Sequence, residues 1–536
     1  MDKNKGNRLN KDIKIDKPLF LGSIILLLAV SIPIIMNPEA AMEVVNSINA
    51  VITKYFGNWY VWFAFFALIV VIWFIFGKYG NIKLGDPDTK PEYSTFSWIA
   101  MLFCGGLGGT LIYWGFIEWI YYFQDPPLHY EAGTWAAAEL SAALGPYHWA
   151  FMSSAIYIIG AAACGYMIYV RKINVFRISE ACRGAFGDKV DGILGRIIDI
   201  GFIFGLVGGS ATAFSAGTPL ITALFSQLTG IPDNNTLKVV TLVVIAAIFA
   251  CTSYLGVSKG LKFVSDWNIR ITITVLIAIM VLGAGGLVFT LDMTTTAVGI
   301  IAQNFIQLNS WMDPGNVTNN YPESWSVYMW SYSTVYAPFY GLFYARISKG
   351  RTIKQMILGT VGSLSIGCIF VFLILSSFGI NLHMTGGMDL IASINEVGGA
   401  YTIISMIDTL PAAGVFKAVI LLVMVAFVVT TYDATSGVLA SVSQTRVDET
   451  GESKRWLRLV WAAGLVALPT GFILAGSPLT AIQTIVIICA LPCTFVCIAL
   501  VKSFIGMVKQ DEKDGKFSLK TGWYNENGLT KEQKGE

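Results

Sequence analysis

The sequence predicts an all-α polytopic membrane protein with twelve transmembrane helices, and three observations support this fold class. Of its 536 residues 55% are hydrophobic and only 13% are charged, which is about half the charged share of an ordinary soluble protein. The mean hydropathy is +0.63. Apolar runs of about 20 residues, the length of one helical crossing of a bilayer, recur along the whole chain. These features exclude a water-soluble enzyme, and the formal net charge of +2 gives no basic excess that would indicate nucleic-acid binding.

Twelve hydrophobic segments, each long enough for one crossing, can be placed in order. They lie near 18–36, 57–77, 96–120, 146–170, 192–227, 238–256, 267–290, 323–346, 352–379, 415–441, 456–475 and 479–507. The fifth segment exceeds a simple crossing, so we expect it to bend or to begin on the membrane surface around 192–200. Segment 293–309 is apolar with polar interruptions and too short to span, which favours a helix lying along the outer surface.

The Lys and Arg residues test this count, because they concentrate on alternate loops. The opposite loops 121–145, 291–322, 380–414 and 476–478 contain no Lys or Arg, and Lys54 is the clear exception. Basic residues mark the cytoplasmic side of a membrane protein. We therefore expect both termini in the cytoplasm. An odd number of spans would have placed basic loops on both sides.

Signatures of an enzyme are missing from the sequence. There are three histidines, and no Walker loop, HExxH or GxSxG motif with supporting context is present. The eight cysteines include no Cys-x-x-Cys pair and do not form a disulfide or zinc framework. The polar start, residues 1–17, leads into a full-length span, so no cleavable signal peptide is expected. We expect no catalytic residue, no metal and no cofactor.

The third span contains a stretch that disfavours regular helix. Residues 104–110 have the sequence CGGLGGT, and each glycine costs about 1 kcal/mol in a helix relative to alanine. Irregular backbone at membrane depth is tolerated where it is buried or lines a wet cavity, and such discontinuous helices form substrate sites in secondary transporters. Close helix–helix packing through small residues is the alternative interpretation.

The eighth span carries a concentration of aromatic residues between 325 and 338. Tyr332 and Tyr336 are spaced i, i+4 and share a face; Tyr113 and Trp149 follow irregular stretches and could join them. Aromatic ring faces attract cations, and quaternary ammonium groups are typical ligands of such cages. The alternative is the aromatic belt at the membrane interface, which suits Trp325.

Five charged residues lie at membrane depth, where ionisable groups are costly and often functional: Glu118, Asp199, Asp266, Arg270 and Asp433. The i, i+4 spacing of Asp266 and Arg270 allows a structural pair. Glu118 lies near the outer end of its span and could be interfacial, and Asp199 could belong to a surface helix. Asp433 follows two threonines whose oxygens could hold a small cation.

Three motifs resemble one known family: IYWGFIEW at 112–119, GPYHW at 145–149 and ARISKGR at 345–351. Together they resemble the betaine/carnitine/choline transporter family, closest to its carnitine/γ-butyrobetaine exchanger branch. The resemblance implies a LeuT-like fold in the membrane of a bacterial or archaeal cell. It divides the chain into an N-terminal tail 1–17, two extra helices 18–95, a first inverted repeat 96–290, an external surface helix and loop 291–322, a second repeat 323–507 and a C-terminal tail 508–536.

The resemblance also implies roles for individual residues. The central aromatic cage would consist of Tyr113, Trp149, Tyr332 and Tyr336, with Ser333 beside them. Gly106, Gly108 and Thr110 would belong to the flexible stretch that contacts the substrate's carboxylate. Trp325 would match an outer or regulatory substrate position, and Thr430, Thr431 and Asp433 a possible ion-coupling site.

Two departures from the family pattern affect the expected substrate and coupling. Family members usually have W-x-W-W in the eighth span, where this chain has Trp330-Ser331-Tyr332-Ser333, which reshapes the cage. Thr110 ends the glycine stretch, as in exchanger-like members. An acidic residue there would suit choline, whereas Thr110 favours a substrate with its own carboxylate.

The sequence thus favours a secondary transporter of a zwitterionic quaternary-ammonium compound, such as carnitine, γ-butyrobetaine or glycine betaine. We expect alternating access and sodium-independent exchange, in a lipid bilayer, with a homotrimer implied by the family alone. The alternative is a sodium-coupled betaine symporter for osmoprotectant or nutrient uptake. A membrane receptor that binds betaine without moving it is the interpretation from another class of protein.

Overall fold

The fold is helical throughout the part of the chain that the structure describes. A computed structural model describes residues 13–107, 110–255, 260–448, 452–474 and 479–534. Strand pairing in these ranges is limited to isolated bridges, such as Lys83 with Thr352. The predicted all-α class is therefore confirmed.

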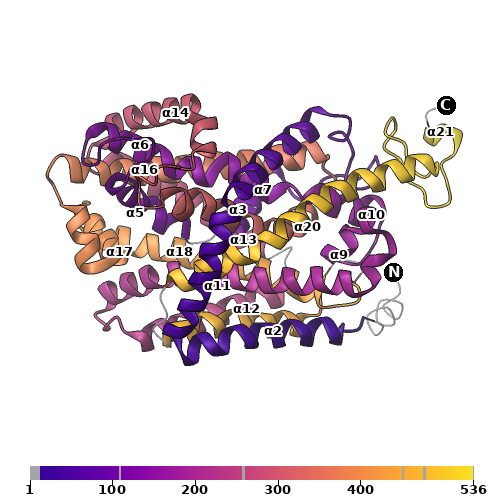
Figure 1. The fold of residues 1–536 in the computed structure, drawn as a ribbon, viewed down its shortest axis with the longest axis horizontal. Helices are drawn as coiled ribbons and strands as arrows, with labels where there is room; N and C mark the ends of the chain where they lie inside the picture. The colour runs from indigo at the N-terminus through magenta and orange to yellow at the C-terminus, as the bar shows by residue number, and fades with distance from the viewer. Residues whose placement is uncertain (1–12, 108–109, 256–259, 449–451, 475–478, 535–536) are drawn as a thin grey trace.

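The first half of the described chain forms the elements of the amino-terminal spans (Figure 1). They are α2 (Lys17–Met36), α3 (Pro38–Phe76), α4 (Thr95–Leu107), α5 (Thr110–Gln124), α6 (Trp135–Tyr147), the π-helical turn η1 (His148–Met152), α7 (Ser153–Ile158), α8 (Ala161–Gly165), the π-helical turn η2 (Tyr166–Val170), α9 (Ile178–Ala181), α10 (Arg183–Phe186), the 3₁₀ turn η3 (Gly187–Asp191), α11 (Ile193–Thr229), α12 (Asn235–Leu255) and α13 (Gly260–Leu282).

The second half begins with the helix that was expected on the outer surface. Its elements are α14 (Gly286–Ser310), the π-helical turn η4 (Glu323–Val327), α15 (Tyr328–Ile347), α16 (Ile353–Met384), α17 (Leu390–Asp408), α18 (Ala413–Val442), α19 (Arg455–Leu474), α20 (Leu479–Lys513) and α21 (Lys531–Lys534).

Long apolar helices dominate the described chain. Nine of them are long and apolar enough to cross a membrane, and up to eleven spans result if each bent pair counts as one. Many of their apolar side chains face outward: on α2, Leu21, Ile25 and Leu28 are at least half exposed. Water would disfavour such a surface, whereas acyl chains match it. The protein is thus a multi-pass membrane protein.

The third span is interrupted at the predicted place. Helix α4 ends at Leu107, α5 begins at Thr110, and their axes differ by 59°. The glycines also bring helices close together: a Cβ on Gly105 would lie 2.6 Å from the ring of Phe343 on α15. The glycine stretch therefore both interrupts the span and allows close helix packing.

The fourth span is also irregular. Pro146 ends the regular hydrogen bonding of α6, and Ala150 inside η1 has the non-helical angles φ −89° and ψ −111°. The span bends by 40° further along, between Ile158 and Ala161. π-helical turns are frequently found at functional sites, and η1 carries His148 and Trp149.

Four elements differ from the sequence prediction. Segment 293–309, expected to be too short to span, belongs to α14, whose 25 residues are long and apolar enough to cross a membrane. Helix α17 lies within 380–414, where a loop was expected; Asp389 caps its N-terminus through hydrogen bonds to the amides of Ile391 and Ala392. Helix α3 begins nineteen residues before the predicted 57, and α6 begins inside the predicted loop 121–145. Hydropathy locates the apolar part of a helix, while caps and tertiary packing determine where it begins.

Helix α11 is a single element of 37 residues. At 1.5 Å per residue it is longer than a hydrocarbon core of about 30 Å requires. Near its beginning, the carboxylate of Asp199 accepts hydrogen bonds from the amide of Ser179 (2.9 Å) and from its hydroxyl (2.6 Å). Asp199 therefore ties α9 to α11, which is a structural role.

Helix α15 is the most enclosed element of the centre. It packs against α7, α8, α11 and α20, and almost all its side chains are buried. Because α15 carries most of the predicted aromatic cage, the packing around it determines where the cage faces.

At the end of the molecule that carries both termini, an ion pair anchors α20 (Figure 1). Asp511 accepts hydrogen bonds from Arg171 Nε (2.8 Å) and Nη2 (2.9 Å) and from the hydroxyl of Tyr166 (2.9 Å). Its side chain is 5% exposed, so this pair is shielded from solvent.

We expect Asp511→Ala to lower the unfolding free energy by about 3–5 kcal/mol, because it leaves the guanidinium of Arg171 buried without its acceptor. Thermal unfolding of the detergent-purified protein measures the effect. Asp514→Ala, at an exposed position three residues further on, is the matched control. Equal midpoints for the two variants would contradict the assignment.

Candidate substrate site

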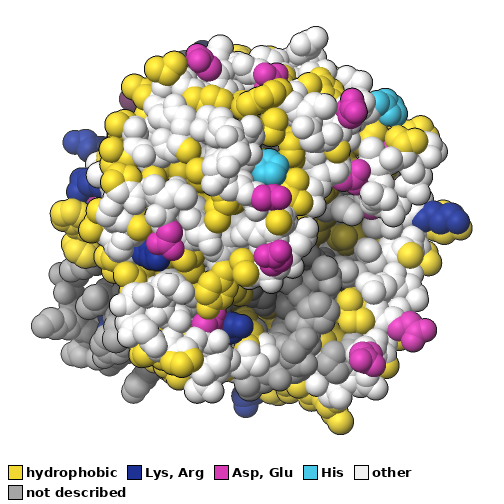
Figure 2. All heavy atoms as spheres, turned by 90° about the vertical axis from the view of Figure 1, so that its left-hand side faces the viewer, with side chains coloured by type: hydrophobic (Ala, Val, Ile, Leu, Met, Phe, Trp, Pro, Cys, Tyr) yellow, Lys and Arg dark blue, Asp and Glu magenta, His cyan; other side chains and the backbone are white. Residues whose placement is uncertain are grey.

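A cavity of about 1120 Å³ penetrates the protein between its helices. Its outer part is formed by the first half of α3 and by residues 312–325, and its deepest described residues include Tyr332 and Thr212. Figure 2 shows the end of the molecule away from the termini, and this face is hollowed. The cavity is therefore a vestibule that leads toward the middle of the helices.

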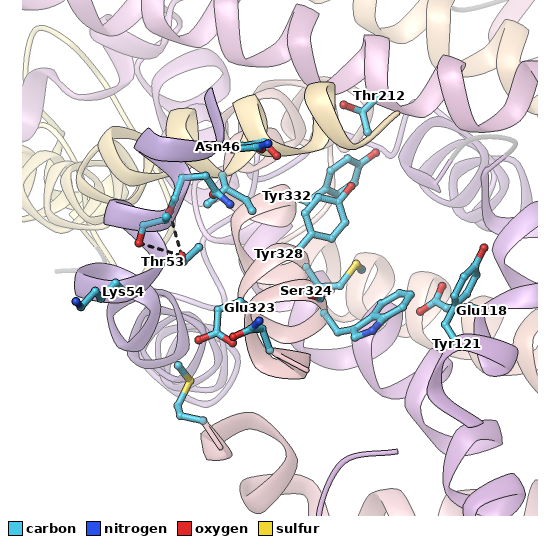
Figure 3. Close-up of a pocket in the computed structure, with 18 of the residues that line it drawn as sticks. Asn46, Thr53, Lys54, Glu118, Tyr121, Thr212, Glu323, Ser324, Tyr328 and Tyr332 are labelled. Atoms are coloured by element: carbon cyan, nitrogen blue, oxygen red, sulfur yellow. Dashed lines mark hydrogen bonds between the residues drawn. The ribbon is translucent and has the colours of Figure 1, made fainter. Parts of the chain in front are cut away.

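The vestibule has two walls of different chemistry (Figure 3). One wall comes from α3 and is polar. It contributes Asn46, Asn49, Thr53, Lys54 and Asn58. Across the cavity lies an aromatic wall. It contributes Trp114, Tyr121, Trp149, Trp325, Tyr328 and Tyr332. Lys54, the exception to the distribution of basic residues, lies on the polar wall.

Trp325 lies at the centre of an outer aromatic cluster. Its ring centroid lies 4.5 Å from that of Tyr122, 5.9 Å from Tyr121 and 6.4 Å from Trp114. Trp325 is only partly buried and lines the cavity, so its ring is accessible to a solute. Trp325 is therefore placed to contact a solute in the cavity, in addition to the membrane-interface role that its sequence position allows.

Of the four residues predicted to form the central cage, Trp149 and Tyr332 line the vestibule. Tyr336 lies one turn beyond Tyr332, with ring centroids 5.0 Å apart, and is 2% exposed. Trp149 is 5% exposed and packs against Phe372 at 5.8 Å. These three rings lie on α15 and η1, so elements from both predicted repeats contribute to the site.

Tyr113 and Ser333 lie outside the described lining of the cavity. The hydroxyl of Tyr113 packs against Gly399 of α17, and its ring lies edge-on to Trp114 at 5.2 Å. The hydroxyl of Ser333 donates a hydrogen bond to Ser153 Oγ (2.9 Å). Both roles in substrate binding stay predictions, and in this conformation neither side chain faces the vestibule.

The glycine stretch meets the vestibule at Thr110, which is a lining residue. Its hydroxyl donates to the carbonyl of Leu107 (3.3 Å), across the break between α4 and α5. The carbonyl of Gly106 accepts a hydrogen bond from the hydroxyl of Tyr340. Gly108 lies outside the described residues.

Glu118 is buried, whereas its position near the end of the predicted span suggested an interfacial residue. It is 1% exposed because α5 continues to Gln124, more than a turn past it. Its Oε1 accepts a hydrogen bond from the hydroxyl of Tyr122, and its Oε2 accepts one from Trp149 Nε1 (2.9 Å). Glu118 therefore fixes the orientation of a predicted cage residue.

The possible ion-coupling residues lie on α18, beside the end of α4. Thr430 Oγ1 lies 3.3 Å from the carbonyl oxygen of Cys104 and 2.8 Å from that of Phe427. Thr431 donates to the Phe427 carbonyl (3.0 Å), and Asp433 is 1% exposed. The first contact joins α18 to the beginning of the glycine stretch.

The i, i+4 spacing of Asp266 and Arg270 allowed an ion pair between them, but both side chains contact other residues. Asp266 accepts a hydrogen bond from Ser97 Oγ (2.9 Å). The guanidinium of Arg270 lies over the rings of Phe96 (5.0 Å) and Trp267 (5.6 Å). Both residues therefore join α13 to α4 and stabilise the packing of the interrupted span.

Sequence analysis missed a continuous tyrosine stripe on α15. The ring centroids of Tyr328, Tyr332, Tyr336, Tyr340 and Tyr344 follow one another at 6.0, 5.0, 5.6 and 5.0 Å. The i, i+4 spacing that linked Tyr332 to Tyr336 extends to all five and would have revealed it. The stripe runs from the vestibule into the protein.

A multi-pass helical protein with an interrupted helix beside an aromatic vestibule has the architecture of a secondary transporter. The family model described as "BCCT, betaine/carnitine/choline family transporter" matches residues 18–513. The chain therefore belongs to the betaine/carnitine/choline transporter family, and it is a transporter of this family's class of compounds and not an enzyme.

Two relatives that are more than 30% identical agree with this assignment. The chain is 31% identical over 454 residues to the uncharacterized transporter YeaV of Escherichia coli strain K12, covering 84% of this chain and 92% of that protein. It is 32% identical over 447 residues to a carnitine transporter of Acinetobacter baumannii, covering 83% and 80%. A solved Na⁺-coupled sialic acid symporter, in a substrate-bound outward-open state, matches with a TM-score of 0.41 and 12% identity over 83% of this chain and 86% of that chain.

Proposed function

We propose that this protein exchanges zwitterionic quaternary-ammonium compounds, such as carnitine, γ-butyrobetaine or glycine betaine, across the cell membrane without sodium. The observation that supports this proposal most directly is the aromatic wall of the vestibule, where Trp149, Tyr332 and Trp325 are accessible to a solute. A quaternary ammonium group cannot donate hydrogen bonds, so ring faces are suitable partners for it. The carnitine transporter of A. baumannii is similar along most of its length.

The aromatic wall and the glycine stretch suit the two ends of a zwitterion. The ammonium head would enter the aromatic wall, first beside Trp325 and then between Trp149 and Tyr332. The carboxylate would be held by hydrogen-bond donors near the glycine stretch, with Thr110 as the described one that lines the cavity. Tyr332 and Ser333 in place of two indoles reshape the cage, and the ring of Tyr336 packs against that of Tyr332.

Transport would follow alternating access in a twelve-span, LeuT-like arrangement with both termini in the cytoplasm. In that arrangement α4 to α13 and α15 to α20 form the two inverted repeats, and α2 and α3 are the extra helices. The vestibule opens away from the termini and thus toward the outside. A homotrimer is proposed by family resemblance alone.

A sodium-coupled betaine symporter is the second candidate. The observation in its favour is the contact of Thr430 with the carbonyl of Cys104, which brings hydroxyl and carbonyl oxygens together beside the interrupted helix. Oxygen atoms of this kind are ligands for hard cations. Thr431 and Asp433 on the same helix would complete such a site.

Proteoliposomes separate these candidates. Vesicles preloaded with unlabelled carnitine or γ-butyrobetaine should accumulate the labelled compound in sodium-free buffer, and empty vesicles should not. Uptake that requires a sodium gradient would establish the symporter instead. Binding without accumulation would indicate a receptor, the interpretation from another class of protein.

A further inference from the structure

Glu118 is a buried carboxylate whose hydrogen-bond partners carry no fixed positive charge. Its oxygens accept from Tyr122 and Trp149. Tyr321 and Cys368 are the other titratable groups that interact with it electrostatically. A carboxylate at membrane depth with no cationic partner is energetically unfavourable, and either a proton or an approaching cation removes that cost.

The helices that pack against α5 offer no cation close to Glu118. Among the described residues, α5 contacts α6, α11, α16 and α17. Their sequences contain only two Lys or Arg residues, Arg196 and Lys354, each in the first turns of its helix. Lys354 lies fourteen residues before Cys368, or about 21 Å along α16. The acidic residues of these helices are Glu139 on α6, Asp199 on α11, and Glu396 and Asp408 on α17. The imidazole of His383 on α16 lies 6.1 Å from the ring of Trp119.

A chain of hydrogen bonds connects Glu118 to the turn that precedes α15. The hydroxyl of Tyr122 lies 2.9 Å from His148 Nδ1, and His148 Nε2 lies 3.2 Å from Ser326 Oγ. Tyr122, His148 and Ser326 are all buried. Each group in this series of hydrogen bonds can both donate and accept a proton. All the hydrogen bonds of the series can therefore point either toward Glu118 or away from it.

The direction of the chain depends on the proton of Glu118. When Glu118 is ionised, Ser326 donates to Nε2, Nδ1–H donates to Tyr122, and Tyr122 donates to the carboxylate. When Glu118 is protonated, every hydrogen bond is reversed and the imidazole carries its proton on Nε2. Conversion between the two forms moves one proton between Glu118 and the end of the chain at Ser326.

Glu118 also lies where a cation would arrive. It lines the vestibule together with Trp114 and Tyr121 of the same helix and with Trp325, and Figure 3 shows its side chain beside Tyr121 at the aromatic end of the cavity. A quaternary ammonium head among these rings would therefore lie close to the carboxyl group. It would place a positive charge beside Glu118, whereas Lys54, a cation that lines the same cavity, lies on the opposite wall (Figure 3).

We propose that Glu118 is protonated in the empty transporter and that binding of a quaternary ammonium compound releases this proton. This inference rests on the function proposed above. In the release step the O–H bond of Glu118 breaks and its proton passes to Tyr122, whose own proton passes to His148 Nδ1. The Nε2 proton then passes to the hydroxyl of Ser326, whose own proton is transferred to water; Ser324 and Trp325, which precede Ser326 in the sequence, line the cavity. One cationic head enters and one proton leaves, so the charge near Glu118 is unchanged.

Linkage gives the expected pH dependence. Because the bound state holds one proton fewer, the dissociation constant should rise about tenfold for each unit of pH decrease while the empty site is protonated. It should become independent of pH once the empty site has lost its proton. A group that stayed neutral or ionised throughout would produce no such slope.

Isothermal titration of carnitine and γ-butyrobetaine into the detergent-purified full chain, in buffers of different ionisation enthalpy, measures the protons released. We expect close to one proton per bound molecule at low pH. Glu118→Gln should bind more weakly, release no proton and show no pH dependence. Glu323→Gln, which removes another carboxylate of the same cavity, should retain the release.

The outcomes distinguish this inference from the proposed function. Binding of either compound by the wild-type protein with no proton release between about pH 5.5 and 8, where a shifted carboxyl group would titrate, overturns the role of Glu118 and leaves the transporter assignment intact. Proton release that persists in Glu118→Gln also overturns it. Absence of binding at every pH overturns both.

Discussion

Replacing Tyr332 with leucine should weaken the binding of carnitine and γ-butyrobetaine by at least about 30-fold. Tyr332 lines the vestibule. Within the tyrosine stripe its ring lies between that of Tyr328, near the entrance, and that of Tyr336, deeper in the protein. A desolvated cation–π contact contributes about 2 kcal/mol or more. Loss of this ring alone therefore predicts a decrease in affinity of about 30-fold, and the altered packing of Tyr336 should add to it.

Two further variants test whether the ring face of Tyr332 is the group that holds the ammonium head. Tyr332→Phe keeps the aromatic face and should bind within a few-fold of the wild type. Tyr55→Leu, at an aromatic position of α3 that is 70% exposed, should have no effect. Titration calorimetry on each purified variant measures the affinity. Near-normal affinity of Tyr332→Leu would contradict the cage.

The interruption of the third span could be predicted from sequence because its cause is local. Four glycines within 104–110 disfavour helix through backbone entropy, independently of tertiary structure. The break in the fourth span could not be predicted in the same way. Pro146 indicates a local disturbance, but the π-helical turn that follows depends on how His148 and Trp149 find partners on other helices.

The direction of individual aromatic side chains could be predicted only within one regular helix. Tyr332 and Tyr336 lie on the uninterrupted α15, so their spacing fixed their common face. Tyr113 follows the break between α4 and α5, and the rotation across that break sets which neighbour it meets. Its hydroxyl packs against Gly399 of α17, a helix within 380–414, where a loop was expected.

The environment of Glu118 also depends on elements far away in the sequence. The family motif identified its position, and its place near the end of an apolar run suggested exposure. Burial follows because α5 extends to Gln124 and because Trp149 and His148, from another span, cover it. Residue spacing alone does not predict burial by helices that are distant in the sequence.

A second ionic cluster consists of Arg346, Glu452 and Arg458. It lies at the end of the protein that is opposite to the vestibule. Glu452 accepts from Arg346 Nη2 (2.8 Å) and from Arg458 Nη2. The side chain of Arg346 is 11% exposed and that of Arg458 only 1%. Arg346 lies in the last turn of α15, and Arg458 lies in the first turns of α19, so one carboxylate joins two helices.

Alternating access requires this end to open when the vestibule closes. Tyr332 and Arg346 are fourteen residues apart on α15, or about 21 Å, so movement of α15 would act on the vestibule and on this cluster together. The hydroxyl of Tyr169 also donates to the carbonyl of Arg346 (2.6 Å). The cluster thus stabilises the conformation in which the vestibule is open.

Glu452→Ala should therefore shift the protein toward the opposite conformation. The side chain of Glu452 is 26% exposed, so its removal should cost less than that of a fully buried partner; about 2 kcal/mol corresponds to a change in the conformational equilibrium of about 30-fold. With Asn46→Cys as a reporter in the vestibule, Glu452→Ala should slow labelling by a membrane-impermeant thiol reagent. Asp86→Ala is the matched control, because Asp86 and Lys172 form an exposed pair, with side chains 47% and 58% exposed, that contributes little. Equal labelling rates in all three backgrounds would show that Glu452 does not hold this end closed.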